Sequence, residues 1–228
     1  MSVTTFVMVP GAGGQAWYWH RLVPELERRG HRALAVDLPS GDDTAGLTAY
    51  TDAVVQAIGP RSPVVLVAQS MGGLTAPLVC ERVPVELLVL VNAMIPLPGE
   101  TGAAWWTVTG QGAAQAAYWA QSGLPGAPDD EVAFFHDVPD DVVAAAQDRP
   151  FAQSDRPFED PWPLTRWPDV PTRVPAGRDD RFFPVGFQRR LAAERLGLEI
   201  DELPGGHLVA LSRPAELADR LTSYLGSM

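Results

Sequence analysis

The hydroxyl of Ser70 is the side chain of this sequence best placed to act as a nucleophile. It lies in AQSMGG, residues 68–73, a small-x-Ser-x-Gly pattern. The aliphatic run 64–67 precedes it and a helical pattern with Leu74 and Leu78 follows. A tight, strained turn between a buried strand and a helix lifts a serine hydroxyl clear of the sheet edge. The alternative is an ordinary turn in which Ser70 only caps the helix.

A serine hydroxyl is a weak nucleophile until a base removes its proton. His207 could be that base, because it follows the last predicted strand, 198–203, in a Gly-Gly-His turn. The carboxylate that would orient its imidazole could come from Asp179 or Asp180, which both follow a strand predicted at 171–175. The residues alone leave both acids open.

A glycine-rich loop, PGAGG at residues 10–14, follows a first strand predicted at 4–9. It lacks the Lys-Ser/Thr ending of a phosphate-binding loop and a GxGxxG pattern ahead of a helix, so nucleotide binding is disfavoured. Glycines let the backbone approach a reacting group closely. We expect the N–H of Ala12 in this loop and the N–H of Met71 to form an oxyanion hole.

Strands and helices alternate along most of the chain, which predicts an α/β fold with a mostly parallel sheet and flanking helices. Strands are expected at 4–9, 33–36, 64–67, 86–92, 171–175 and 198–203. Helices are expected at 17–29, 47–58, 103–121, 139–147, 184–195 and 214–225, and after Ser70. The alternation stops at Pro96. Residues 1–96 and 169–228 therefore form the predicted core.

Residues 97–168 are too long for a plain loop and are predicted to form an inserted helical cap. This segment is rich in aromatic side chains, which could form an apolar lid over Ser70 or the small core of the cap itself. The predicted pocket takes Trp105, Trp106 and Trp119 from the cap and Trp17 from the core. A His136-Asp137 pair also lies here, where a catalytic base is not expected.

Composition excludes several classes of protein. The 228 residues are 46% hydrophobic and 20% charged, as in globular proteins, and fit one domain. A net charge of -11 argues against nucleic acid and anionic membranes as partners. The single cysteine, Cys80, excludes an intramolecular disulfide. The first residues lack a basic segment, and no apolar run is long enough to span a membrane, so a cytoplasmic location is expected.

Four segments together resemble the α/β-hydrolase superfamily over nearly the whole chain: VPGAGG with the following Trp17, AQSMGG, GRDDRFFP and GGHLVALSRP. The order Ser, Asp, His along the chain belongs to the same superfamily. The chain is most similar to its compact branch, which includes plant methylesterases and hydroxynitrile lyases. The resemblance implies a triad of Ser70, His207 and Asp180, because Gly177, Asp180 and Pro184 fit the family's spacing. Asp179 is the alternative acid.

Two departures bear on the reaction. Hydroxynitrile lyases of this branch carry a threonine and a lysine at the places of Gly11 and Leu208, which we include in the predicted pocket. Without a cation for cyanide, the resemblance implies a serine hydrolase that cleaves an apolar carboxylic ester or lactone without metal or cofactor. The alternatives are a triad-based lyase or other non-hydrolytic enzyme, and a ligand-binding receptor. The sequence leaves the oligomeric state open, a homo-oligomer included.

Overall fold

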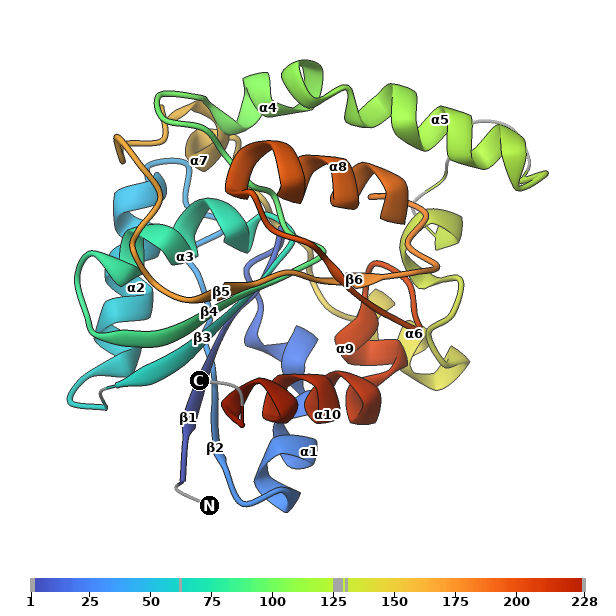
Figure 1. Ribbon diagram of the computed structural model, residues 1–228. Coiled ribbons are helices and arrows are strands. Elements are labelled where there is room, and N and C mark those ends of the chain that lie inside the picture. Colours follow the sequence, from blue (N-terminus) through green and yellow to red (C-terminus); the bar gives the residue numbers. More distant parts are fainter. Residues whose placement is uncertain (1–2, 62, 125–128, 130, 227–228) are drawn as a thin grey trace.

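The computed structural model describes residues 3–61, 63–124, 129 and 131–226. Its centre is a five-stranded sheet of order β2-β1-β3-β4-β5, in which neighbouring strands are parallel (Figure 1). A second pair of parallel strands, β6 and β7, continues beyond it. The strands are β1 (Thr5–Val9), β2 (Arg32–Ala35), β3 (Val64–Gln69), β4 (Val85–Val91), β5 (Thr172–Arg173), β6 (Pro175–Gly177) and β7 (Asp201–Leu203). The predicted α/β fold with a mostly parallel sheet is confirmed.

The end of the sheet that carries β6 and β7 is more broken than the sequence predicts. The strand expected at 171–175 is split into β5 and β6, because the Val174 carbonyl accepts the N–H of Asp201 over 2.9 Å. The Pro175 carbonyl in turn accepts the Asn92 N–H over 3.2 Å, so β6 adjoins the end of β4. The last strand is shorter than the expected 198–203. These short strands place the loops that follow β6 and β7, which carry Asp180 and His207, beside β4.

Helices cover both faces of the sheet (Figure 1). They are α1 (Leu22–Arg28), α2 (Leu47–Ile58), α3 (Gly72–Cys80), α4 (Gly102–Thr109), α5 (Gln111–Gln121), α6 (Asp140–Gln147), α7 (Arg156–Glu159), α8 (Val185–Leu196), α9 (Val209–Ser212) and α10 (Pro214–Leu225), with a 3-10 turn η1 (Ala16–Trp19) and a π-helical turn η2 (Glu131–Phe135). Side chains of α2, α3 and α8 form one buried cluster, and those of α1, α9 and α10 form another. Alternate residues of β3 enter the two clusters, as a strand buried on both faces requires.

Two predicted helices are each broken in two. The helix expected at 17–29 is η1 followed by α1, with the break at His20 and Arg21. The helix expected at 103–121 is divided into α4 and α5 at Gly110, whose φ of 68° is left-handed. A left-handed residue ends a helix, and glycine adopts that conformation without steric cost. The hydrophobic pattern continued across Gly110, so the pattern alone joined the two helices.

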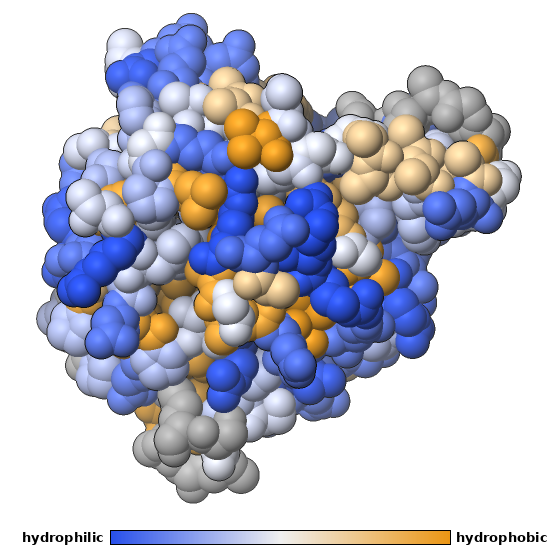
Figure 2. Space-filling model, turned by 45° about the horizontal axis from the view of Figure 1, so that its top comes forward, coloured by the Kyte–Doolittle hydropathy of each residue, from blue (hydrophilic) through white to orange (hydrophobic). Residues whose placement is uncertain are grey.

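Residues 97–168, which we call the insertion, hold α4, α5, η2, α6 and α7 between β4 and β5. Two tryptophans near its C-terminal end attach it to the core: Trp162 Nε1 donates to the Leu74 carbonyl over 3.0 Å and Trp167 Nε1 to the Pro96 carbonyl over 3.0 Å. Helix α5 has no charged residue. Its side of the molecule is the lobe at the upper right of Figure 2, where pale orange, weakly apolar residues lie beside a grey patch. That the insertion acts as a lid stays a prediction.

None of the helices in the described part of the chain combines the length and the apolar character needed to cross a bilayer. The free Cys80 is half-buried on α3, and its Sγ contacts the Ala76 carbonyl oxygen at 3.5 Å. Burial raises the pKa of its thiol to about 12, so the thiolate that would make it reactive is disfavoured. Cys80 is therefore a packing residue of α3.

Candidate active site

Ser70 stands at the turn between β3 and α3 in a strained backbone conformation. Its φ is 52°, in the left-handed region that residues with a side chain rarely adopt. The turn is held from both sides: the Ser70 N–H donates to the Val91 carbonyl over 3.2 Å, and the Ser70 carbonyl accepts the Met94 N–H over 2.9 Å. Strain of this kind persists only where the surroundings enforce it, and it often marks functional sites.

The glycines after Ser70 are required by close backbone contacts. A Cβ on Gly72 would lie 2.8 Å from the Pro10 carbonyl oxygen, and one on Gly73 would lie 2.0 Å from the Met94 carbonyl oxygen. The position two residues before the serine holds Ala68, which is fully buried in β3 beside Val9. One methyl group fits there, so the Ala at this position does not disturb the elbow.

The imidazole of His207 lies between Ser70 and Asp180. Its Nε2 is 3.0 Å from the Ser70 hydroxyl and its Nδ1 is 2.8 Å from Asp180 Oδ2. A carboxylate can only accept, so Nδ1 carries the hydrogen and Nε2 is free to accept the serine proton. His207 and Asp180 are 1% and 0% exposed, which shields this chain of hydrogen bonds from water. The arrangement can transfer a proton from Ser70 to His207.

The structure separates the two candidate acids. Asp180 Oδ1 also accepts the backbone N–H groups of Phe182 and Phe183, each over 2.8 Å, which fixes the carboxylate in place. The side chain of Asp179 is half-exposed; it accepts the Gly205 N–H over 3.1 Å and lies 3.6 Å from Arg178. Asp180 thus contacts His207, while Asp179 caps the turn before it.

Asn92 ties the loop of His207 to the loop of the acid. Its Nδ2 donates to the carbonyls of Gly206 and His207, each over 3.1 Å, and its Oδ1 accepts the Gly177 N–H over 2.7 Å. Asn92 is fully buried at the end of β4 with a φ of 45°. The sequence reasoning missed this residue, although a polar side chain directly after a buried strand at the carboxyl edge of a sheet was a usable signal.

Two glutamine side chains complete this buried network. Gln188 of α8 bridges the Asn92 and Asp180 side chains, with its Nε2 3.3 Å from both Asn92 Oδ1 and Asp180 Oδ2. Gln69, directly before Ser70, donates to the His207 carbonyl over 3.3 Å. The positions of nucleophile, base and acid are therefore coupled through side-chain amides as well as through the triad contacts. Sequence reasoning missed both glutamines.

The glycine-rich loop lies directly beside Ser70. A Cβ on Gly11 would be 2.8 Å from Ser70 Cβ, so only glycine allows this approach. The Gly14 N–H donates to the Gly11 carbonyl over 3.1 Å and closes the loop as a turn. Within the described residues, no acceptor binds the N–H of Ala12 or the N–H of Met71, the two predicted oxyanion donors. Both N–H groups are available to a ligand, and their role stays a prediction.

Three phenylalanine rings surround the imidazole of His207. The ring centroids of Phe134, Phe182 and Phe183 lie 5.4, 5.1 and 5.0 Å from it, all at steep interplanar angles. Phe134 comes from η2 of the insertion, and the other two follow Asp180. Trp106 of α4 lies 5.8 Å from Phe182. The base therefore works in an aromatic environment, and the predicted pocket included Trp106 but none of the three phenylalanines.

The residues predicted to line the pocket fall into two groups. Trp105 is fully buried against Phe183 and Phe187, and Trp119 is 3% exposed, so both side chains pack the insertion on the core; that they line a pocket stays a prediction. The half-buried positions are Trp17, Trp106 and Leu208, whereas Gly11 is buried against Ser70. The ring of Trp17 stacks on His20 and carries the guanidinium of Arg149 at 5.2 Å.

The His136-Asp137 pair contacts the loop that carries His207. Asp137 Oδ2 accepts the Gly206 N–H over 2.9 Å, and a Cβ on Gly206 would meet His136 Nε2 at 2.6 Å. Burial lowers the pKa of His136 and outweighs the opposite effect of Asp137. The pair thus supports the His207 loop and does not contact Ser70.

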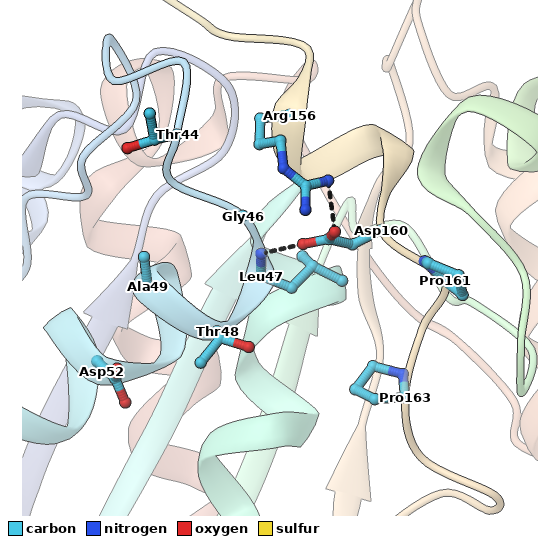
Figure 3. Close-up of a pocket in the computed structure, with 10 residues that line it drawn as sticks. All are labelled: Thr44, Gly46, Leu47, Thr48, Ala49, Asp52, Arg156, Asp160, Pro161 and Pro163. Atoms are coloured by element: carbon cyan, nitrogen blue, oxygen red, sulfur yellow. Dashed lines mark hydrogen bonds and ion pairs between the residues drawn. The ribbon is translucent and has the colours of Figure 1, made fainter.

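A separate pocket of about 470 Å³ lies where α7 meets the start of α2 (Figure 3). Asp160 Oδ2 accepts the Leu47 N–H over 2.9 Å at the helix N-terminus, and Asp160 Oδ1 pairs with Arg156 at 2.5 Å. A carboxylate is favourable at this end of a helix. None of the residues of the triad lines this pocket. Arg156 and Asp160 pair with each other there, and the bond from the Leu47 N–H to Asp160 attaches the insertion to the core.

Comparison with known proteins gives three kinds of match. A family model described as the alpha/beta hydrolase family matches residues 6–220. Probable esterase PIR7A of Oryza sativa subsp. indica is 36% identical over 107 residues, which cover 42% of this chain and 41% of that protein. Polyneuridine aldehyde esterase of Rauvolfia serpentina is 32% identical over 108 residues, 42% of this chain and 41% of that protein. The matched region thus spans about two fifths of these relatives.

Solved structures match over almost the entire chain. The crystal structure of polyneuridine aldehyde esterase has a TM-score of 0.77 at 22% identity, covering 98% of this chain and 100% of that one. The structure of the methylesterase MES16 from Arabidopsis has a TM-score of 0.77 at 19% identity, covering 99% and 100%. At these identities the likeness establishes the fold.

Proposed function

Because this chain belongs to the alpha/beta hydrolase family, we propose that it is a serine hydrolase that cleaves an apolar carboxylic ester or lactone. The observation that carries the proposal is the continuous chain from Ser70 Oγ through His207 to the buried carboxylate of Asp180, with contacts of 3.0 and 2.8 Å. Esterase names among the partial sequence relatives support the same reaction class.

Acylation begins when Ser70 Oγ attacks the ester carbonyl carbon and His207 Nε2 takes the hydroxyl proton. The carbonyl oxygen becomes an oxyanion, which the N–H groups of Ala12 and Met71 stabilise. The tetrahedral intermediate then collapses, the bond to the alcohol oxygen breaks, and the Nε2 proton passes to that leaving group. Asp180 stabilises the imidazolium that forms in between and holds its tautomer. The acyl group remains on Ser70.

Deacylation repeats the same steps with water. His207 Nε2 takes a proton from a water molecule as its oxygen attacks the acyl carbon, and the second oxyanion uses the same donors. When this intermediate collapses, Ser70 Oγ leaves and recovers its proton from His207. The carboxylic acid product therefore carries one oxygen from solvent. In a lactone the acid and the alcohol would leave as one molecule.

The apolar character of the substrate follows from the surroundings of the base. Phe134 and Phe182 contact the imidazole, and Trp106 lies beside Phe182. Aromatic faces of this kind bind apolar groups, and they exclude water from the charged intermediates. The half-buried Leu208, next to the base, offers no cation to a leaving group. These features favour an uncharged ester over a charged substrate.

The test is turnover of p-nitrophenyl esters of increasing acyl length by the purified protein and by Ser70→Ala. The wild type should release p-nitrophenol and react with a fluorophosphonate probe at the peptide containing Ser70. The Ser70→Ala variant should lose both activities while its melting temperature stays close to that of the wild type. Retained turnover in Ser70→Ala would defeat the assignment.

Product analysis in ¹⁸O-labelled water distinguishes hydrolysis from a lyase that uses the same triad as acid and base. Hydrolysis must place one labelled oxygen in the carboxylic acid, whereas elimination places none. A ligand-binding receptor would show negligible turnover and would copurify with a retained ligand. Each outcome therefore identifies one of the three classes that the sequence allows.

A further inference from the structure

We infer that Gln153, in the insertion, is a positioning residue for the oxyanion loop: its side-chain oxygen holds the backbone of Gly13, next to the proposed donor Ala12. The inference rests on the proposed hydrolase function. It adds a residue 140 positions away in the sequence that makes no contact with the triad. It also gives the insertion a part in transition-state stabilisation that differs from covering a pocket.

The central contact is a hydrogen bond from the Gly13 N–H to Gln153 Oε1 over 3.0 Å. The other side of Gly13 is also fixed, because its carbonyl accepts the Ser40 hydroxyl over 2.8 Å. Core and insertion therefore hold the two peptide groups of this one glycine. The two residues that hold Gly13 are also joined through the backbone, because the N–H of Ser154, next to Gln153, donates to the Ser40 carbonyl over 2.7 Å.

The shape of the loop makes this contact consequential. Gly11 and Gly14 close a turn through the bond from the Gly14 N–H to the Gly11 carbonyl, and the Gly13 φ of 85° is that of the third residue of a type II turn. Type I and type II turns differ by a flip of the central peptide, here the one between Ala12 and Gly13. Gln153 binds the N–H of that peptide and so stabilises the observed form.

The Gln153 side chain is itself held in place. Its Nε2 lies 3.2 Å from the Tyr50 hydroxyl on α2 and donates to the Ser154 carbonyl over 2.8 Å. The ring of Phe151 covers Gly13 on the open side, since a Cβ there would lie 2.7 Å from Phe151 Cε2. Because the Nε2 group of the Gln153 amide is fixed, its Oε1 can hold a glycine-rich loop that would otherwise sample many conformations.

Loss of this contact should weaken transition-state binding more than substrate binding. The Ala12 N–H is expected to bind the oxyanion, which exists only during the reaction. The Ala12 N–H belongs to the peptide before the one that flips, so the effect on it is indirect. Without the Gln153 acceptor the loop on both sides of Ala12 samples more conformations, and the donor is aligned for a smaller fraction of the time. The consequence is a lower kcat with little change in KM.

The experiment compares Gln153→Met, which keeps the side-chain volume but removes the acceptor, with Gln153→Asn, whose amide is too short to reach Gly13. Both variants should lower kcat about tenfold, the effect of about one net hydrogen bond, with KM within about twofold. An alkyl trifluoromethyl ketone, which forms an oxyanionic adduct on the serine, should bind about tenfold more weakly. Hydrogen exchange in the peptide of residues 10–17 should become faster.

The matched control is Asp160→Ala, which removes another contact of the insertion with the core, at the Leu47 N–H, without touching the glycine-rich loop. It should keep kcat and inhibitor affinity near those of the wild type. Equal losses in Asp160→Ala and Gln153→Met would show that attachment of the insertion is what matters, and would overturn the inference.

Wild-type kcat, inhibitor affinity and loop exchange in both Gln153 variants would also overturn it, and would leave the proposed function intact. By contrast, a wild-type protein without Ser70-dependent turnover would remove the proposed function and this role together. The two failures are therefore distinguishable.

Discussion

The side-chain amide of Asn92 donates to the backbone carbonyl of His207 over 3.1 Å, from a fully buried position with left-handed backbone geometry. Because the other end of the same amide accepts the Gly177 N–H, a single side chain at the end of β4 sets the spacing of two loops. The base is thus positioned by contacts to its backbone as well as to its ring.

Replacement of Asn92 should lower both stability and activity. Asn92→Gly leaves the Gly177 N–H and the Gly206 carbonyl without the partner that Asn92 supplies, and the His207 carbonyl keeps only Gln69. This should cost about 2–4 kcal/mol in the free energy of unfolding by urea. Asn92→Ala should cost about 1 kcal/mol more, because alanine tolerates the left-handed conformation poorly. Equal stabilities of the two variants would contradict the role of backbone strain at this position.

The two neighbouring acids should differ sharply in their effect on turnover. Asp180→Asn should lower kcat about a thousandfold to ten-thousandfold, because an amide stabilises neither the correct tautomer nor the imidazolium of His207. Asp179→Asn is the matched control. It removes the charge of the neighbouring residue, whose side chain only caps a turn, so kcat should stay within about threefold of the wild type. Rates of p-nitrophenyl ester cleavage measure both. A larger loss in Asp179→Asn would reverse the assignment.

The sequence was sufficient to predict the family and the alternating fold, and the reasons are local. A buried strand, a small-residue turn and a helix stand in order around Ser70, and the family match over residues 6–220 confirms the resemblance carried by four separate motifs. The Ser70, His207 and Asp180 side chains each follow a strand at the carboxyl edge of a parallel sheet. Their convergence follows from topology.

The missed features depend on contacts between distant segments. Nothing near Gln153 in the sequence indicates that it reaches Gly13, 140 residues away. The aromatic residues of the insertion could be counted but not assigned, because burial decides between Trp105, which packs in the core, and Phe134, which contacts His207. The helix break at Gly110 has a local cause: this glycine takes the left-handed conformation that ends α4, while the hydrophobic pattern continues across it.

Glycine positions provide a test of the close contacts at the elbow. Gly73→Ala would place a Cβ 2.0 Å from the Met94 carbonyl oxygen, so the start of α3 must move away from the loop that follows β4. We expect a loss of about 2–4 kcal/mol in unfolding free energy and a large loss of activity. Gly186→Ala, at a helical site with nothing within 4 Å, should instead stabilise by about 0.5 kcal/mol. Urea unfolding of both variants measures the contrast.

The buried His136 predicts how stability depends on pH. Burial, assisted by the charge of Arg181, lowers the pKa of its imidazole, and Asp137 opposes this only in part. The unfolded chain therefore binds a proton more readily than the folded protein when the pH falls below about 6.5, the usual value for histidine. Stability present above that pH should decrease as the pH falls.

The measurement is the urea midpoint of wild type and His136→Gln at intervals from pH 7.5 to 5. The wild type should lose more stability than the variant over this range, because the variant has no imidazole to protonate at this site. His31, whose pKa burial also lowers, is present in both proteins, so its contribution cancels in the difference. Parallel pH profiles of the two proteins would show that His136 is not held neutral by folding, and that the His207 loop rests on a site without pH sensitivity.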